Sequence, residues 1–287
     1  MHWTDRREKF RAILEGDICV HPSSVFDAMS ARIAEDLGYE VGMFAGSVAS
    51  MAILGAPDLV LITLTEFAEQ AYRINRAGNL PLIVDADHGY GNALNVRRTV
   101  EELETAGVAA LSIEDTALPK PYGTDKYTLI SIDEGVAKMK AALDARAEPS
   151  LTIVGRTSAP SITNTEDAIK RAVAYEKAGV DVLMIIGIKT RAELEALRAE
   201  TTVPVILAHS GGELADLKYL ASQGVRVRLQ PHLPIHAAVQ AVYDTLRVLR
   251  NGTPPSEITN VVKGDLKEKI LRGGDHKTWL KDFLSSE

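Results

Sequence analysis

The sequence predicts a (β/α)8 barrel of the TIM type with a C-terminal helical extension. Short apolar runs alternate with amphipathic segments eight times along the 287 residues, without a long interruption. Helix-start and helix-end signals recur between these runs, and a hydrophobic content of 46% suffices for one large core. Eight strand-helix units in series favour a closed barrel. The alternative, an open doubly wound sheet, would leave some of the strands without a place.

The elements are expected in a regular order. The candidate strands are the eight apolar runs Ile18–Val20, Val41–Ala45, Leu80–Asp85, Ala109–Ile113, Leu151–Gly155, Asp181–Ile186, Val203–Ala208 and Val225–Leu229. A capping box, in which Ser or Thr and a Glu three residues later satisfy free backbone donors, is expected where a helix begins. Such pairs are Thr63 with Glu66, Ser131 with Glu134, Thr163 with Glu166, and Thr190 with Glu193. The barrel is expected to span residues 1–250, and the extension residues 251–287.

The overall composition excludes several classes of protein. The formal net charge of -7, with no basic stripe, argues against a nucleic-acid partner. No stretch is long and apolar enough for a membrane span, and Met1–Arg11 lacks the apolar core of a signal peptide. The single cysteine, Cys19, excludes an intrachain disulfide framework and reads as a small buried hydrophobe. We therefore expect a cytoplasmic protein without nucleic-acid or membrane partners.

Carboxylates gather where two successive strands are predicted to end. Asp85 and Asp87 lie two residues apart at the end of one apolar run, so their side chains point to the same face. Glu114 ends the next run along the chain. Oxygen ligands without cysteine or paired histidine suit Mg²⁺, or Mn²⁺, better than zinc. Because reactive groups of such barrels lie after the strands, we predict a metal site here. The competing interpretation is that Asp and Gly simply form turns.

Other strand ends carry polar groups that suit an anionic substrate. Arg156 follows an apolar run, where its planar fork can grip a carboxylate, although a surface ion pair is the alternative. Gly46 and Ser47 offer backbone N–H groups and a hydroxyl to an anion, or form an ordinary turn. His209 and His232 follow the last two strands, with a satisfied polar residue at a loop start as the competing interpretation.

The chain resembles the isocitrate lyase and phosphoenolpyruvate mutase superfamily nearly from end to end. The resemblance implies a Mg²⁺-dependent enzyme that acts on 2-oxo acids or their enolates. It further implies that Asp85 binds the metal directly, that Asp87 and Glu114 do so partly through water, and that Asp58 supports them. Ser47 and Arg156 would bind the substrate carboxylate. The motifs that carry the resemblance are Phe44-Ala45-Gly46-Ser47, Gly55-Ala56-Pro57-Asp58, Asp85-Ala86-Asp87-His88-Gly89-Tyr90-Gly91-Asn92, Ile113-Glu114-Asp115 and Gly155-Arg156-Thr157.

The loop after Glu114 separates the branches of the superfamily. It reads Leu118-Pro119-Lys120-Pro121-Tyr122-Gly123-Thr124, without the cysteine of the isocitrate lyases or the asparagine segment of the phosphonate branch. The subgroup that the chain most resembles is the soluble, biotin-free oxaloacetate decarboxylases, with His232 near the substrate and His236 a weaker candidate. This implies decarboxylation of oxaloacetate, a 2-oxo dicarboxylate, to pyruvate and CO2 through an enolate stabilised by the metal. A C–C lyase, a phosphonopyruvate-type hydrolase and a non-catalytic dicarboxylate binder are the alternatives.

The C-terminal tail has an apolar face that needs a partner. It begins at a Gly-Thr-Pro-Pro segment and continues as short amphipathic helices containing Trp279, Leu280, Phe283 and Leu284. The resemblance implies that the last barrel helix is exchanged between subunits and that the assembly is a homotetramer, a dimer of dimers.

Overall fold

The barrel prediction is confirmed. The computed structural model describes residues 3–208 and 212–285. Eight parallel strands form one sheet in chain order, and Val20, ahead of the first strand, bridges Val227 in the last and so closes the sheet. The Val20 N–H donates to Arg226 O, and its carbonyl accepts from Arg228 N, both at 2.9 Å. The strands are β1 (Ser23–Ser24), β2 (Gly42–Phe44), β3 (Leu82–Asp85), β4 (Ala110–Glu114), β5 (Thr152–Thr157), β6 (Val182–Ile186), β7 (Val205–Ala208) and β8 (Val225–Arg228).

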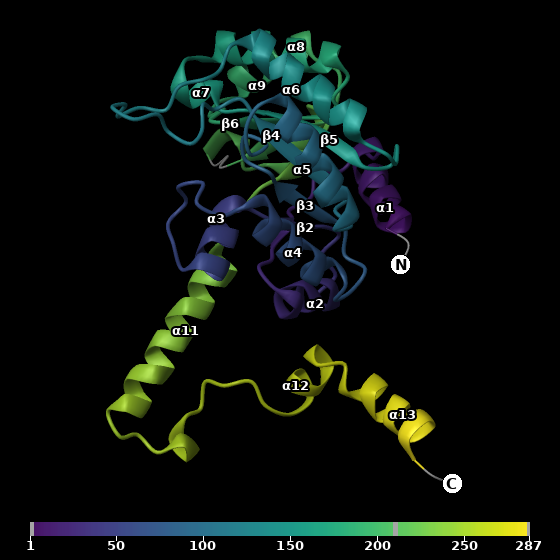
Figure 1. The fold of residues 1–287 in the computed structure, drawn as a ribbon, viewed down its shortest axis with the longest axis vertical. Coiled ribbons are helices and arrows are strands. Elements are labelled where there is room, and N and C mark those ends of the chain that lie inside the picture. The colour runs from purple at the N-terminus through teal and green to yellow at the C-terminus, as the bar shows by residue number, and fades with distance from the viewer. Residues whose placement is uncertain (1–2, 209–211, 286–287) are drawn as a thin grey trace. The chain divides into compact units, whose positions relative to one another are not determined.

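Helices surround this sheet (Figure 1). Helix α5 (Ala93–Thr105) buries Val96, Val100 and Leu103, whose spacing of four and three residues places them on one face toward the strands. The other helices are α1 (Thr4–Glu15), α2 (Ala28–Asp36), α3 (Gly46–Ala49), the π-helix Ser50–Leu54, α4 (Leu64–Asn75), α6 (Ile132–Ala145), α7 (Ala159–Ile162), α8 (Thr165–Ala178), α9 (Arg191–Glu200), the 3-10 turn Gly212–Leu214 and α10 (Leu217–Ser222).

Three of the four predicted helix starts are correct. Thr63 and Thr190 each form a complete capping box, and the Ser131 side chain accepts from the Glu134 N–H. The box expected at Thr163 is wrong. Helix α8 begins one residue later, because the Asn164 side chain accepts from the Asp167 N–H at 2.9 Å and takes the capping position.

The first strand was also misplaced. It was expected at Ile18–Val20, but Ile18 is 55% exposed and only Val20 of that run pairs in the sheet. The strand itself is Ser23–Ser24, paired with β2. Pro22 separates the two segments and has no N–H to donate. The segment therefore pairs first with β8 at Val20 and then with β2 from Ser23 onward.

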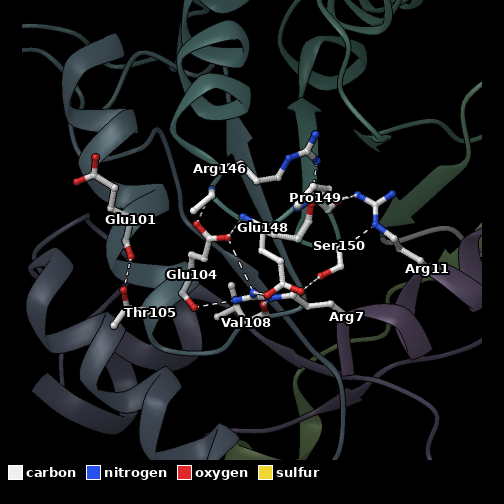
Figure 2. A network of polar contacts seen from close by, with 12 residues as sticks. Arg7, Arg11, Glu101, Glu104, Thr105, Val108, Arg146, Glu148, Pro149 and Ser150 are labelled. Atoms are coloured by element: carbon white, nitrogen blue, oxygen red, sulfur yellow. Dashed lines mark hydrogen bonds and ion pairs between the residues drawn. The ribbon is translucent and has the colours of Figure 1, made fainter. Parts of the chain in front are cut away.

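Helix α1 is attached to the end of the barrel where the strands begin. Arg7, 2% exposed, donates from Nε to Val108 O at 3.0 Å and from Nη2 to Glu104 O at 2.7 Å. Arg11 donates from Nε to Ser150 O at 2.9 Å, and Figure 2 shows these contacts within one network. Because Val108 and Ser150 lie two residues before β4 and β5, the arginines satisfy backbone carbonyls just ahead of these strands. Arginine side chains of α1 thus fix this end of the barrel through backbone carbonyls and through ion pairs with Glu148 and Asp181.

The chain divides into two compact units, residues 1–232 and 233–287. The second unit consists of α11 (Leu233–Arg250), the 3-10 turn Pro255–Glu257, α12 (Gly264–Ile270) and α13 (Gly273–Leu284). Its helices expose large apolar side chains, with Phe283 76% and Leu284 77% exposed. Among the described residues, none of the helices combines the length and the apolar character that crossing a membrane requires. The boundary expected after residue 250 stays a prediction.

Candidate active site

A cavity of about 370 Å³ lies at the end of the barrel where the strands finish. Asp85 ends β3, Glu114 ends β4, and Arg156 is the last residue but one of β5. The loop between β4 and α6 and the short helix α7 supply further walls. The lining residues are Asp58, Leu59, Val60, Asp85, Asp87, Glu114, Thr116, Leu118, Lys120, Tyr127, Arg156, Ser158, Ser161, Ile162 and Ile186.

Arg156 holds two of the carboxylates in this cavity. Its Nη1 pairs with Asp85 Oδ2, and its Nη2 lies 3.3 Å from Glu114 Oε2. Hydroxyl groups of neighbouring residues add a hydrogen bond to each carboxylate, to the second oxygen of Asp85 and to the same oxygen of Glu114. Ser112 Oγ donates to Asp85 Oδ1 at 3.0 Å, and Thr116 Oγ1 donates to Glu114 Oε2 at 2.8 Å. The acids are therefore oriented by hydrogen bonds from β4 and the residues just after it.

Burial among like charges disfavours the negative charge of Asp87. Its residue is 6% exposed, and burial, followed by the charges of Asp85, Glu114 and Asp58, raises its pKa to about 8. Burial also raises the pKa of Glu114, which Arg156 opposes. Although Asp58 lies at the exposed rim, partial desolvation of its carboxyl and the nearby Asp85 raise its pKa as well. The cavity thus concentrates more negative charge than the protein neutralises.

Arg156 remains charged in this setting. Burial alone lowers the pKa of its guanidinium, but Asp85 and Glu114 outweigh that effect and raise the pKa above its usual value. Its Nε is buried and has no hydrogen-bond partner among the described residues. The two terminal nitrogens of the guanidinium thus both pair with acids.

The donor set fits a hard divalent cation. It consists of carboxylates that repel one another, and oxygen ligands of this kind are what Mg²⁺ prefers. As the side chains stand, no three His, Cys, Asp or Glu of residues 3–208 and 212–285 are grouped closely enough to hold an ion, and Arg156 pairs with two of the acids instead. Gly46 leaves the necessary space, because a Cβ there would lie 2.7 Å from Asp87 Oδ1.

The structure brings five of the predicted site residues to one cavity: Asp58, Asp85, Asp87, Glu114 and Arg156. Gly46 adjoins it through Asp87, with Ser47 following in α3. His232 is not among the lining residues, and its Nδ1 lies 2.8 Å from Ser24 Oγ of β1. His209 falls outside the described residues, and His236 is exposed on α11. The assigned roles of all these residues stay predictions.

Sequence reasoning missed several residues of the site. Lys120 and Tyr127 of the loop after β4 line the cavity, with the Lys120 ammonium 5.4 Å from the Tyr127 ring centre. Nothing in the sequence of that loop predicts which of its side chains point inward. Ser112 and Thr116 had a usable signal, since each lies two residues from Glu114, Ser112 on the same face of β4 and Thr116 just beyond its end. Cys19 is buried, and burial raises the pKa of its thiol to about 11.

A parallel barrel with carboxylates and an arginine converging at the ends of the strands has the architecture of a barrel enzyme, whose active site lies at that face. The chain belongs to the phosphoenolpyruvate phosphomutase family, whose sequence model matches residues 10–250. It is 60% identical over 284 residues to a protein of Rhodopseudomonas palustris (strain BisB18) named oxaloacetate decarboxylase, covering 99% of both chains.

Solved structures of the same family share the fold. A phosphoenolpyruvate phosphomutase from Streptomyces platensis subsp. rosaceus superimposes with a TM-score of 0.86 at 25% identity, covering 97% of this chain and 99% of that one. A phosphonopyruvate hydrolase in complex with oxalate and Mg²⁺ gives a TM-score of 0.83 at 26% identity, covering 98% and 99%.

Proposed function

We propose that this protein is a carboxy-lyase that converts oxaloacetate to pyruvate and CO2 with the help of Mg²⁺ or Mn²⁺. The observation that carries the proposal is the cavity in which Asp85, Asp87 and Glu114 converge beside Arg156. The full-length similarity to a protein named oxaloacetate decarboxylase supports the same reaction. The single buried cysteine is compatible with a reducing cytoplasm, where we place the enzyme.

The proposed roles follow from the positions of the side chains. Asp85, Asp87 and Glu114 would hold the cation, with Asp58 at the rim supporting them. When bound, the cation would supply a Lewis acid that stabilises negative charge developing on the substrate. Arg156 would turn one edge of its guanidinium to the carboxylate next to the 2-oxo group.

Gly46 and Ser47 would complete the binding of that carboxylate. Both lie in α3, directly after β2, and Gly46 adjoins Asp87. The Ser47 hydroxyl and the backbone N–H groups offer hydrogen-bond donors beside the arginine fork. Such fixed donors would orient the substrate so that its C3–C4 bond stands free of the carboxylate-binding groups.

The reaction needs one bond cleavage and one proton transfer. The C3–C4 bond breaks, CO2 leaves, and the electron pair passes through C3 into the C2 carbonyl to give the enolate of pyruvate. A proton delivered to C3 then forms pyruvate. We assign this proton transfer, or the orientation of substrate for it, to His232. Its ring is oriented by Ser24, whose hydroxyl contacts Nδ1 at 2.8 Å.

The loop 118–130 would close the cavity during the reaction. It is pinned at its base, because Ala117 N donates to Thr128 O at 2.8 Å and Ile130 N donates to Asp115 O at 2.9 Å. Leu118 and Lys120 line the cavity, whereas Tyr122 at the far end of the loop is fully exposed. The loop therefore has a fixed base and a free tip, as a lid requires.

We further propose a homotetramer, a dimer of dimers, in which α11 is exchanged between subunits and residues 251–287 pack on a neighbour. The support is the apolar surface of the second unit. On α11, Val242, Tyr243 and Leu246 are 58%, 60% and 62% exposed. In water such surface is expected to be covered by another chain.

The decisive experiment is a substrate panel. Purified protein with Mg²⁺ is offered oxaloacetate, methylisocitrate and phosphonopyruvate, and pyruvate release is followed. We expect turnover of oxaloacetate to exceed that of the other two by a wide margin. Faster cleavage of methylisocitrate or phosphonopyruvate would move the protein to a lyase or hydrolase branch, and binding without turnover of any substrate would make it a dicarboxylate binder. Unchanged activity in excess chelator would refute the role of the cation.

A further inference from the structure

The turn that follows β3 has an energetically unfavourable backbone conformation. Asp87 and Tyr90 have φ angles of 48° and 59°, and Gly89 between them has a φ of 79°. Residues other than glycine adopt the left-handed region only at a cost in free energy, so this conformation persists only where the surroundings enforce it. Asp87 is one of the proposed cation ligands. The support of this turn therefore decides where its carboxylate lies.

Three consecutive carbonyls of the turn are held by three different elements. Asp87 O accepts from the Glu114 N–H of β4 at 2.8 Å. His88 O accepts from Lys138 Nζ of α6 at 2.9 Å, and Gly89 O accepts from Thr99 Oγ1 of α5 at 3.0 Å, a hydroxyl that also lies 3.0 Å from Asn95 O. The first contact is a main-chain bond, which any sequence could make. The other two depend on particular side chains.

Lys138 has no role in the reaction described above, yet it is buried. The residue is 3% exposed, and Thr99 is fully buried. Removing an ammonium group from water is costly unless it is well paired, so a lysine in this place needs a structural or functional reason. Lys138 is not there to pair with Nδ1 of the His88 ring, because that nitrogen has no hydrogen-bond partner among the described residues. The Lys138 ammonium donates instead to the main chain of the turn, at His88 O.

We propose that Lys138, together with Thr99, is a positioning residue for the divalent cation. By holding the His88 and Gly89 carbonyls, these side chains keep Asp87 in its left-handed conformation and its carboxylate directed at Asp85 and Glu114. This inference rests on the proposed cation site. If Lys138 positions the ligands, its removal weakens cation binding. If it acted only through its charge, which repels a cation, its removal would strengthen binding.

The test is the binding of Mn²⁺ to the full-length protein without substrate, measured by isothermal titration calorimetry. Lys138→Met removes the ammonium and keeps an unbranched side chain of similar length. Groups that orient metal ligands typically contribute 10- to 100-fold in metal affinity, so we expect binding weaker by that order. Thr99→Val, nearly isosteric, should weaken binding in the same direction. Lys140→Met, the same change at an exposed position of α6, should leave affinity unchanged.

Equal or tighter Mn²⁺ binding by Lys138→Met would overturn the proposal, and tighter binding would show that the charge acts alone. Circular dichroism verifies that each variant is folded. If Lys138→Met does not fold, Thr99→Val provides the test. Unchanged Mn²⁺ affinity in that variant would contradict the proposal that the turn positions Asp87 for the cation. The proposed reaction fails by a different result, namely wild-type protein that binds Mn²⁺ but releases no pyruvate from oxaloacetate.

Discussion

Replacing Asp87 by Asn should make the ion-free protein less sensitive to alkaline pH. Burial and neighbouring acids raise the pKa of Asp87 from its ordinary 3.8 to about 8 in the folded protein. Between these values the folded state binds a proton that the unfolded state has lost. Stability attributable to this group is therefore unaffected at pH below 3.8 and falls as the pH rises toward 8. Asn keeps the shape of the side chain but cannot ionise.

The magnitude follows from the same values. Each pH unit between the two pKa values corresponds to ~1.4 kcal/mol, so the whole interval corresponds to on the order of 6 kcal/mol as an upper limit. Asp87 is 6% exposed, and solvent therefore screens this effect little. We expect the free energy of unfolding of Asp87→Asn, relative to wild type, to rise by about 1 kcal/mol per pH unit from pH 5 to pH 7.

Urea unfolding at pH 5, 6 and 7 in the presence of a chelator measures this difference. The exposed Asp17→Asn is the matched control and should show no such trend. Saturating Mg²⁺ should cancel the advantage of the Asp87 variant, since the cation compensates the buried charge of the wild type. A stability difference that stays constant across the pH range would mean that the Asp87 carboxyl is not buried among like charges, and the description of the site would fail.

Three further predictions address other parts of the molecule. Arg156→Lys keeps the charge but loses the planar fork, and steady-state kinetics should show kcat/KM for oxaloacetate lower by about 10- to 100-fold, mainly through KM; an unchanged value would make the arginine structural. His232→Ala should lower kcat by about 10²–10⁴ if the histidine transfers the proton, whereas wild-type turnover would remove it from the mechanism. Arg7→Met should lower the free energy of unfolding by at least about 2 kcal/mol while leaving kcat of the folded protein unchanged, and a loss of activity at full stability would contradict this.

Much of the architecture could be predicted because parallel strands buried on both faces leave a strong apolar signal. The runs Ala109–Ile113 and Asp181–Ile186 each fall within one residue of the strands observed. The first strand could not be found in this way. Ser23 and Ser24 carry no apolar pattern, and their pairing with β2 depends on where Pro22 interrupts the chain.

The site shows the same division between strands and loops. Asp85, Glu114 and Arg156 were found because strand ends in a parallel barrel converge at one face. The inward-facing positions of Lys120 and Tyr127 were not, because they depend on the path of a loop whose base is set by pairing between Thr116 and Leu129. The role proposed for Lys138 could not be predicted for another reason. On a helix its sequence neighbourhood is that of a surface lysine, and only the fold brings the His88 carbonyl to it.

Arg7 and Arg11, at the end of the barrel where the strands begin, have a consequence for engineering this enzyme. Most of their hydrogen bonds go to main-chain carbonyls, which are present whatever the side chains of those residues are, and ion pairs with Glu148 and Asp181 add to them. A library of substitutions in loop 118–130 and around α7 would therefore leave the anchoring of α1 intact. Substrate specificity could therefore be selected in these segments without redesign of the contacts between α1 and the barrel. Stabilising substitutions could be introduced independently at the end of the barrel where the strands begin.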